Sequence, residues 1–249
     1  MSKTIAVVNR KGGVGKTATT QALGAGLKNK GYRVLYIDLD SQGNLTYTLG
    51  AQAVQSSLDF LTGKVTAAQI IQKTDQADVI PASPDLANAD AIITGTGKEY
   101  RLQEALEPIK NKYDFIILDT PAQLGTLTIN ALTAANSAII PVQAEIYSLH
   151  GIGLLNDAIG AVRKYCNRDL AIAGILITRY NGRAVISKDM RDNLEEIAQL
   201  LDTQLFSTPI RECISIKEAQ ARQQDIYSYA PRSNAAKDYK AFIDELLAK

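Results

Sequence analysis

The sequence has few of the residues that build metal or redox centres. Its 249 residues include two cysteines and one histidine. Cys166 and Cys213 lie far apart with no C-x-x-C pair, so no metal or iron–sulfur site is expected within one chain. We expect free thiols in a reducing cytoplasm. His150 falls near an expected helix start without paired ligands, and we expect it to be structural.

Long apolar runs are also missing. No stretch approaches the roughly 20 apolar residues of a membrane span, and no apolar signal segment precedes the first expected strand. No internal repeat or linker rich in Pro, Gly or Ser interrupts the chain, which argues against a domain boundary. We therefore expect one α/β domain over residues 1–249 of a soluble, cytoplasmic protein with no membrane contact.

Charge of one sign is not in excess. The 27 basic and 26 acidic residues leave a net charge of +1 at pH 7. No global field therefore points to nucleic acid, and any contact with DNA has to come from a local patch.

The N-terminal stretch contains a glycine- and lysine-rich loop between an expected strand and an expected helix. The strand covers residues 5–10, the loop 11–17 reads KGGVGKT, and an apolar-periodic run follows over 18–27. The first turn of a helix has unpaired N–H groups and a positive dipole end, which together bind an anion. Lys16 can reach the β- and γ-phosphates, and the Thr17 hydroxyl can ligate magnesium. The stretch predicts binding of ATP or GTP.

Three acidic residues follow expected buried strands. Asp38 closes the run 33–38 and Asp40 follows it, while Asp119 closes the apolar run 113–119. Open parallel sheets bind ligands at the carboxyl ends of their strands, so we expect these acids beside the loop. Alternation turns Asp38 and Asp40 the same way if the strand extends through both. We assign Asp119 as the acid that holds magnesium. For residues 38–44, the alternative to a functional site is an ordinary solvated turn.

The loop KGGVGKT resembles the deviant phosphate loop of the ParA/MinD superfamily, in which the first lysine crosses a dimer interface to the partner's nucleotide. Carried over, that role falls on Lys11. Residues 38–44, DLDSQGN, resemble the superfamily motif D-x-D-P-Q-G-N, with Ser41 where proline is usual. The resemblance implies that Asp40 orients the attacking water and that Asp38 supports magnesium through water.

The resemblance also implies which residues contact the nucleotide. Thr178 begins a T-R-Y-N element after an expected strand over residues 170–178, as in MinD relatives, and Pro209 lies in an expected strand and turn over 206–211. Both are carried over as contacts near the adenine base. Together with the loop, the expected nucleotide contacts are Lys11, Gly12, Gly13, Val14, Gly15, Lys16, Thr17, Ala18, Thr178 and Pro209.

The resemblance covers essentially the whole chain and is nearest to small, Soj-like ParA proteins. It implies a P-loop NTPase fold, a mostly parallel twisted sheet with helices on both faces. It implies a weak ATPase with ATP and Mg²⁺ as cofactors, in which Lys11, Lys16 and Asp40 catalyse the hydrolysis of ATP. It further implies a nucleoid-associated homodimer enclosing two nucleotides, which binds DNA non-specifically and serves plasmid or chromosome partition with a ParB-like partner.

Several basic residues are candidates for a DNA-binding patch, although each is equally an ordinary solvated charge. They are Arg163, Lys164, Arg168, Lys188, Arg191, Lys217 and Arg222.

Three alternatives remain open at this stage. A MinD-like ATPase that positions a cargo at a membrane is disfavoured, because no membrane-binding helix follows the apolar stripe of the last helix. A scaffold that dimerises on ATP without hydrolysing it is disfavoured by Asp40, and a metal-cluster carrier by the lack of paired cysteines. The chain begins directly at its first strand, so we expect no N-terminal operator-binding extension.

Overall fold

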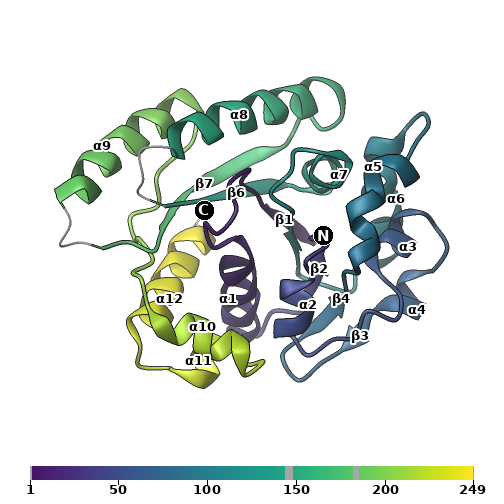
Figure 1. Ribbon diagram of the computed structural model, residues 1–249, viewed down its shortest axis with the longest axis horizontal. Helices are drawn as coiled ribbons and strands as arrows, with labels where there is room; N and C mark the ends of the chain where they lie inside the picture. Colours follow the sequence, from purple (N-terminus) through teal and green to yellow (C-terminus); the bar gives the residue numbers. More distant parts are fainter. Residues whose placement is uncertain (1, 144–147, 182–184, 249) are drawn as a thin grey trace.

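The computed structural model describes residues 2–143, 148–181 and 185–248, with the side chains of α8 and α9 described from residues 152 and 191 onward. One sheet runs through it in the order β3-β4-β2-β5-β1-β6-β7 (Figure 1). Neighbouring strands are parallel except β3 and β4. The strands are β1 (Lys3–Val7), β2 (Val34–Asp38), β3 (Gln72–Lys73), β4 (Asp78–Ile80), β5 (Phe115–Asp119), β6 (Ser137–Gln143) and β7 (Ala171–Thr178).

Helices cover both faces of this sheet, as predicted for the P-loop NTPase class. The α-helices are α1 (Lys16–Asn29), α2 (Asn44–Thr48), α3 (Ser57–Leu61), α4 (Ala67–Ile70), α5 (Ala89–Ile92), α6 (Arg101–Leu106), α7 (Thr126–Ala134), α8 (Ser148–Tyr165), α9 (Val185–Leu200), α10 (Ile214–Ala221), α11 (Ile226–Tyr229) and α12 (Asn234–Leu247). The part of the chain that the structure describes also contains the short 3₁₀ helices η1 (Pro84–Asn88), η2 (Lys98–Tyr100) and η3 (Glu107–Ile109). Figure 1 shows α8 and α9 on one side of the sheet and α1, α10 and α12 on the other.

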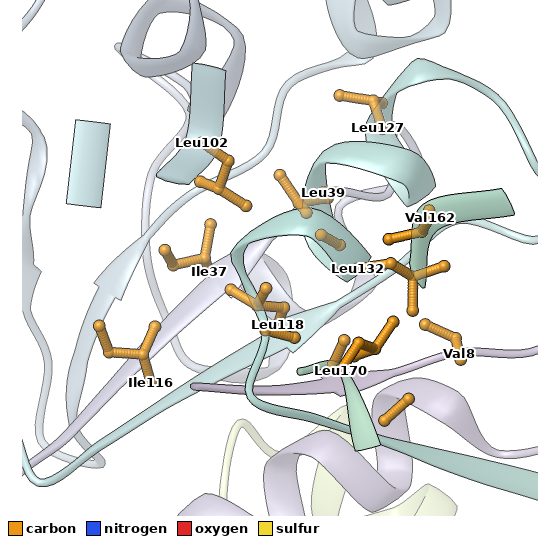
Figure 2. Packing of buried hydrophobic residues seen from close by; sticks show 14 of the residues in the cluster. Val8, Ile37, Leu39, Leu102, Ile116, Leu118, Leu127, Leu132, Val162 and Leu170 are labelled. Atoms are coloured by element: carbon orange, nitrogen blue, oxygen red, sulfur yellow. The ribbon is translucent and has the colours of Figure 1, made fainter. Parts of the chain in front are cut away.

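Strand alternation divides the hydrophobic core into two layers. In β1, Ile5 and Val7 face the layer formed with α1 and α12, whereas Ala6 faces the layer formed with α7 and α8. Because both faces are covered, the strands read as continuous apolar runs. Figure 2 shows the second layer, in which strand residues pack against helix residues such as Leu127, Leu132 and Val162.

The first helix lies unusually close to the sheet. A Cβ added at Gly24 would lie 2.3 Å from the Tyr36 ring, so only glycine allows this approach. The Tyr36 hydroxyl donates to the Gln21 carbonyl at 2.9 Å, and the Tyr227 hydroxyl donates to the Ala22 carbonyl at 3.1 Å. These contacts fix α1 against one face of the sheet, and with it the loop that precedes α1 at the carboxyl edge.

One of the predicted strands is wrong. Residues 206–211 form no strand; only isolated bridges join Leu205 and Arg211 to the chain at β7. The Ser207 N–H donates instead to the Glu245 carboxylate of α12, and Pro209 has no N–H to donate. The strand β2 ends at Asp38, where the predicted run over 33–38 also ends, so it does not extend through Asp40, which lies in the following turn.

Other expectations agree with the described part of the chain. Both cysteines are free, and the last helix buries Tyr239, Phe242 and Ile243. Among the described residues, no helix combines the length and apolar character needed to cross a membrane. The side chain of His150 lies outside the described residues.

Candidate active site

The carboxyl ends of three neighbouring strands meet at one point of the sheet. Asp119, the last residue of β5, is paired in register with Asp38 of β2 on one side and Val7 of β1 on the other. Both aspartates are buried, with exposed fractions of 0% for Asp38 and 1% for Asp119. The sequence predicted that these acids would lie beside the glycine-rich loop, and the structure places them there.

The glycine-rich loop turns between β1 and α1 through two left-handed positions. Gly13 has φ of +77° and Gly15 has φ of +85°, a conformation that side chains disfavour. Alternation of right- and left-handed residues makes successive backbone N–H groups converge, which forms a concave anion site. Since α1 begins at Lys16, its unpaired first-turn N–H groups add to this site.

Buried polar side chains hold the loop from below. The Asn9 carboxamide accepts from the Lys11 N–H at 2.9 Å and donates to the Pro141 carbonyl at 2.7 Å. Gln143 and Thr178, the last residues of β6 and β7, donate to loop carbonyls. Of these three residues, only Thr178 was predicted, and the structure assigns its hydroxyl to the loop backbone.

Lys16 is a buried cation facing the acids. Its side chain is 7% exposed, and its ammonium group donates to the Lys11 carbonyl at 3.2 Å. Burial lowers the pKa of Lys16, while the nearby Asp119 and Asp40 carboxylates oppose that shift. Bound phosphate oxygens would add negative charge here and favour the charged form of Lys16.

Asp119 accepts from two hydroxyls of one helix face. Thr17 Oγ1 lies 2.7 Å from one carboxylate oxygen of Asp119, and Thr20 Oγ1 lies 3.1 Å from the other. Burial raises the pKa of Asp119, and the neighbouring Asp38 carboxylate adds to that effect. A bound cation would oppose this rise in the pKa, because a nearby positive charge favours the ionised carboxylate.

Asp38 anchors the turn that follows β2. Its carboxylate accepts from the Thr46 N–H at 2.8 Å, from the Thr46 hydroxyl at 2.7 Å and from the Asp40 N–H at 3.0 Å. Burial raises the pKa of Asp38, although the Thr46 bonds oppose the shift. These bonds place Asp40 at the open edge, where it is half-buried and accepts from the Gln42 N–H at 3.1 Å.

A cavity of about 290 Å³ lies beside the start of α1. Its lining includes Ala18, Thr178, Ile210, Cys213, Ile216 and Tyr239. A mainly apolar pocket next to an anion site suits the flat base of a nucleotide. Thr178 and Ile210 line this cavity, whereas Pro209 is not among its lining residues. The predicted contact of Pro209 with the base therefore stays a prediction.

The structure distributes the DNA-binding candidates over the two ends of the sheet. The Arg163 guanidinium donates to the Leu170 carbonyl just before β7, whereas Lys217 lines the cavity near Thr178, where β7 ends. An eight-residue strand is about 25 Å long, so these residues lie on separate surfaces. Lys164 and Arg168 flank Arg163 in sequence, and Arg222 follows α10, which contains Lys217.

Arg191 lies on α9 and so belongs to neither group. Its guanidinium pairs with Glu195 of the same helix at 3.2 Å. The side chain of Lys188 lies outside the described residues. Lys11 is half-buried at the base of the loop, beside the exposed residues Gly12 and Gly13.

Sequence reasoning missed several residues of the site. Thr20 lies three positions after Thr17 and so shares its helix face, a spacing that could have revealed it. Gln143 ends a buried strand, as Asp38 and Asp119 do, which is a weaker signal. Asn9 and Thr46 gave no sequence signal, because their roles depend on turns.

Comparison with known proteins agrees with this geometry. A family model described as an AAA domain matches residues 2–172. The sporulation initiation inhibitor protein Soj of Bacillus subtilis is 41% identical over 254 residues, covering 100% of this chain and 99% of that protein. The chain belongs to the AAA domain family, as a Soj-like member of the ParA/MinD superfamily.

Two further matches fit this Soj-like assignment. The chromosome-partitioning ATPase Soj of Treponema pallidum is 34% identical over 252 residues, covering 100% of this chain and 98% of that protein. A crystal structure of cobyrinic acid a,c-diamide synthase from Mycobacterium smegmatis, with bound ATP analogue and magnesium, superposes with a TM-score of 0.87. It is 34% identical and covers 99% of this chain and 95% of that one. The ligands of that structure are the cofactors that the sequence predicted.

Proposed function

We propose that this chain is a ParA-type ATPase, a switch that dimerises on ATP, binds DNA without sequence preference and serves plasmid or chromosome partition with a ParB-like partner. The observation that carries the proposal is one sheet edge where the phosphate loop, the Thr17–Asp119 pair and the Asp38–Asp40 turn meet. The full-length match to a chromosome-partitioning ATPase supports the cellular role. Residues 1–249 act as one nucleotide-binding domain in this proposal.

The loop binds the triphosphate of ATP. Its N–H groups converge through the left-handed Gly13 and Gly15, and Lys16 reaches the β- and γ-phosphates from a buried position. The cavity beside Ala18 and Thr178 receives the base.

Thr17 and Asp119 fit a magnesium ion. They present hard oxygen ligands already 2.7 Å apart, and magnesium in nucleotide sites takes one or two carboxylates plus phosphate oxygens and waters. The described residues contain no cluster of three acidic, His or Cys ligands, which is consistent with a site completed by the nucleotide. Bound magnesium supplies Lewis-acid stabilisation of charge on the phosphate oxygens. Contact of Asp38 with it through water stays a prediction, since protein groups already bond to both carboxylate oxygens of Asp38.

Asp40 orients the attacking water. It lies at the open edge of the site, close enough to Lys16 and Asp119 to influence the pKa of both. The water attacks the γ-phosphorus, the bond to the β–γ bridging oxygen breaks, and ADP and phosphate leave. Positioning and charge stabilisation supply most of the catalysis in such a transfer.

The dimer completes the site. Two chains face each other across the nucleotides, and Lys11 of each reaches the phosphates bound by the other, where its charge offsets the negative charge that develops during transfer. The exposed Gly12 and Gly13 allow a second chain to approach the loop closely.

In this proposal, DNA binds near α10, at the carboxyl end of the strands. Lys217 lines the base cavity, so nucleotide binding can affect its placement. Arg222 follows α10, and its guanidinium carbon lies 5.6 Å from the centre of the Tyr229 ring. The other candidates near Arg163 lie at the far end of β7, remote from the nucleotide. Contacts with DNA phosphates need no base recognition.

Phosphate release and mass measurement test the enzyme and dimer parts of this proposal. The wild-type chain should release phosphate from ATP with Mg²⁺ and form dimers with ATP but not with ADP. Lys16→Ala is the control that removes nucleotide binding. A chain that binds ATP yet releases no phosphate above the Lys16→Ala background would be a non-hydrolysing scaffold, and the proposal would be wrong.

A further inference from the structure

The carbonyl groups of the phosphate loop are held by buried side chains beneath the loop, and this keeps the loop N–H groups facing outward. A loop that binds phosphate with backbone N–H groups must direct its carbonyls elsewhere, because a carbonyl turned toward phosphate would repel it. In this chain, two consecutive loop carbonyls accept from buried side chains. Gln143 Nε2 donates to the Gly13 carbonyl at 2.8 Å, and the Thr178 hydroxyl lies 2.7 Å from the Val14 carbonyl.

These two donors form one unit. Gln143 and Thr178 are register partners at the ends of β6 and β7, so they lie side by side under the loop. Both residues are buried, with exposed fractions of 6% and 2%. The rigid sheet therefore determines the direction of the Gly13 and Val14 carbonyls.

The Thr178 hydroxyl is committed to the backbone. It has one proton, and two carbonyl oxygens lie within reach, that of Val14 at 2.7 Å and that of Val142 at 3.0 Å. Its methyl group lies 3.6 Å from a Cβ position at Gly15, an ordinary packing contact. Neither group is directed to donate a hydrogen bond to a nucleotide base.

We propose that Gln143 and Thr178 are positioning residues that act on the triphosphate through the Gly13 and Val14 carbonyls, so that the loop N–H groups stay turned toward the phosphates. The inference rests on the proposed ATP binding. It reassigns Thr178 from contact with the base to control of the loop. Loss of either donor leaves a loop carbonyl without its buried partner, and the peptide then rotates toward other partners.

Thr178→Val is the most direct test, because it removes the hydroxyl and keeps the shape. The dissociation constants of ATP and GTP are measured by calorimetry with Mg²⁺. The loss of one such hydrogen bond should weaken binding of both nucleotides by about five- to tenfold. Thr178→Ser keeps a hydroxyl and should recover most of the lost affinity. A role in base recognition would instead change the ratio of ATP to GTP affinity, which would overturn the inference.

Thr203→Val is the matched control. The Thr203 hydroxyl also donates to a backbone carbonyl, that of Ile172 at 2.6 Å, but near the opposite end of β7. This variant should lower stability without changing ATP affinity. Equal losses of affinity in Thr203→Val and Thr178→Val would show a general structural effect and contradict the inference.

Gln143→Glu keeps the test decisive if Thr178→Val does not fold. An ionised glutamate cannot donate to the Gly13 carbonyl, whereas a protonated one can. ATP affinity relative to wild type should therefore be low at alkaline pH and recover as pH falls. A ratio that stays constant with pH would count against the inference. If wild type itself binds no ATP, the proposed function fails first, so the two failures are distinguishable.

Discussion

Asp38 and Asp119 are direct partners across β2 and β5, and both carboxylates are buried at the edge of the sheet beside Lys16. Burial and the closeness of the two acids both disfavour their ionisation. Their position therefore has a cost for the nucleotide-free protein, which a bound cation would remove.

The nucleotide-free protein should lose stability as pH rises from about 5 toward 8. The folded-state pKa values of Asp38 and Asp119 are raised above the unfolded value of about 4. In that window the folded state binds more protons than the unfolded state, so the free energy of unfolding falls with rising pH. Urea unfolding at several pH values measures it. Asp119→Asn should flatten the dependence, and an equally steep slope in that variant would contradict this account.

Gly24→Ala should destabilise the chain by roughly 1–3 kcal/mol, the usual cost of overpacking a core. The added methyl would lie 2.3 Å from the Tyr36 ring, and α1 would have to move away from β2. Gly160→Ala is the matched control, since that exposed position in α8 has nothing within 4 Å of its added Cβ. It should gain about 0.5–1 kcal/mol. Denaturant unfolding compares the two variants, and a Gly24→Ala variant as stable as wild type would show that the Tyr36 contact is unimportant.

Lys11→Ala and Lys16→Ala should fail at different steps. Lys16 is buried within its own phosphate site, so its loss should abolish ATP binding. Lys11→Ala should bind ATP as a monomer but not form the ATP-dependent dimer. Calorimetry and light scattering separate the two effects. Normal dimerisation of Lys11→Ala with ATP would remove the cross-interface role.

The two groups of basic residues should differ in their effect on DNA binding. Lys217→Ala and Arg222→Ala should each weaken binding and reduce the salt slope by about 1, because each removes one phosphate contact. Lys164→Ala and Arg168→Ala, at the other end of the sheet, are controls that should leave the slope unchanged. The opposite result would move the DNA-binding surface to the amino end of the strands.

The fold and the placement of the loop beside its acids could be predicted because their signals are local. The order of strand, glycine loop and helix predicts a phosphate site, and apolar runs ending in Asp38 and Asp119 predict the acid-bearing strands. Parallel strands then bring these segments together without further information.

The supporting contacts could not be predicted, because they join residues distant in sequence. Gln143 meets Gly13 across 130 positions and Thr178 meets Val14 across 164. The wrong strand at 206–211 has a similar cause: the Ser207 N–H bonds to Glu245, 38 positions away. A local sequence pattern cannot predict a hydrogen-bond partner that lies so far along the chain.

The central claim is that ATP controls DNA binding, and Asp40→Ala provides the sharpest test of it. This variant should bind ATP and accumulate as a dimer, because it lacks the residue that we propose to orient the attacking water. Its binding to non-specific duplex DNA is measured with ATP, ADP or no nucleotide over a salt series. The account predicts binding with ATP alone, falling steeply as salt rises. Absence of binding with ATP, or equal binding in all three nucleotide states, would contradict it.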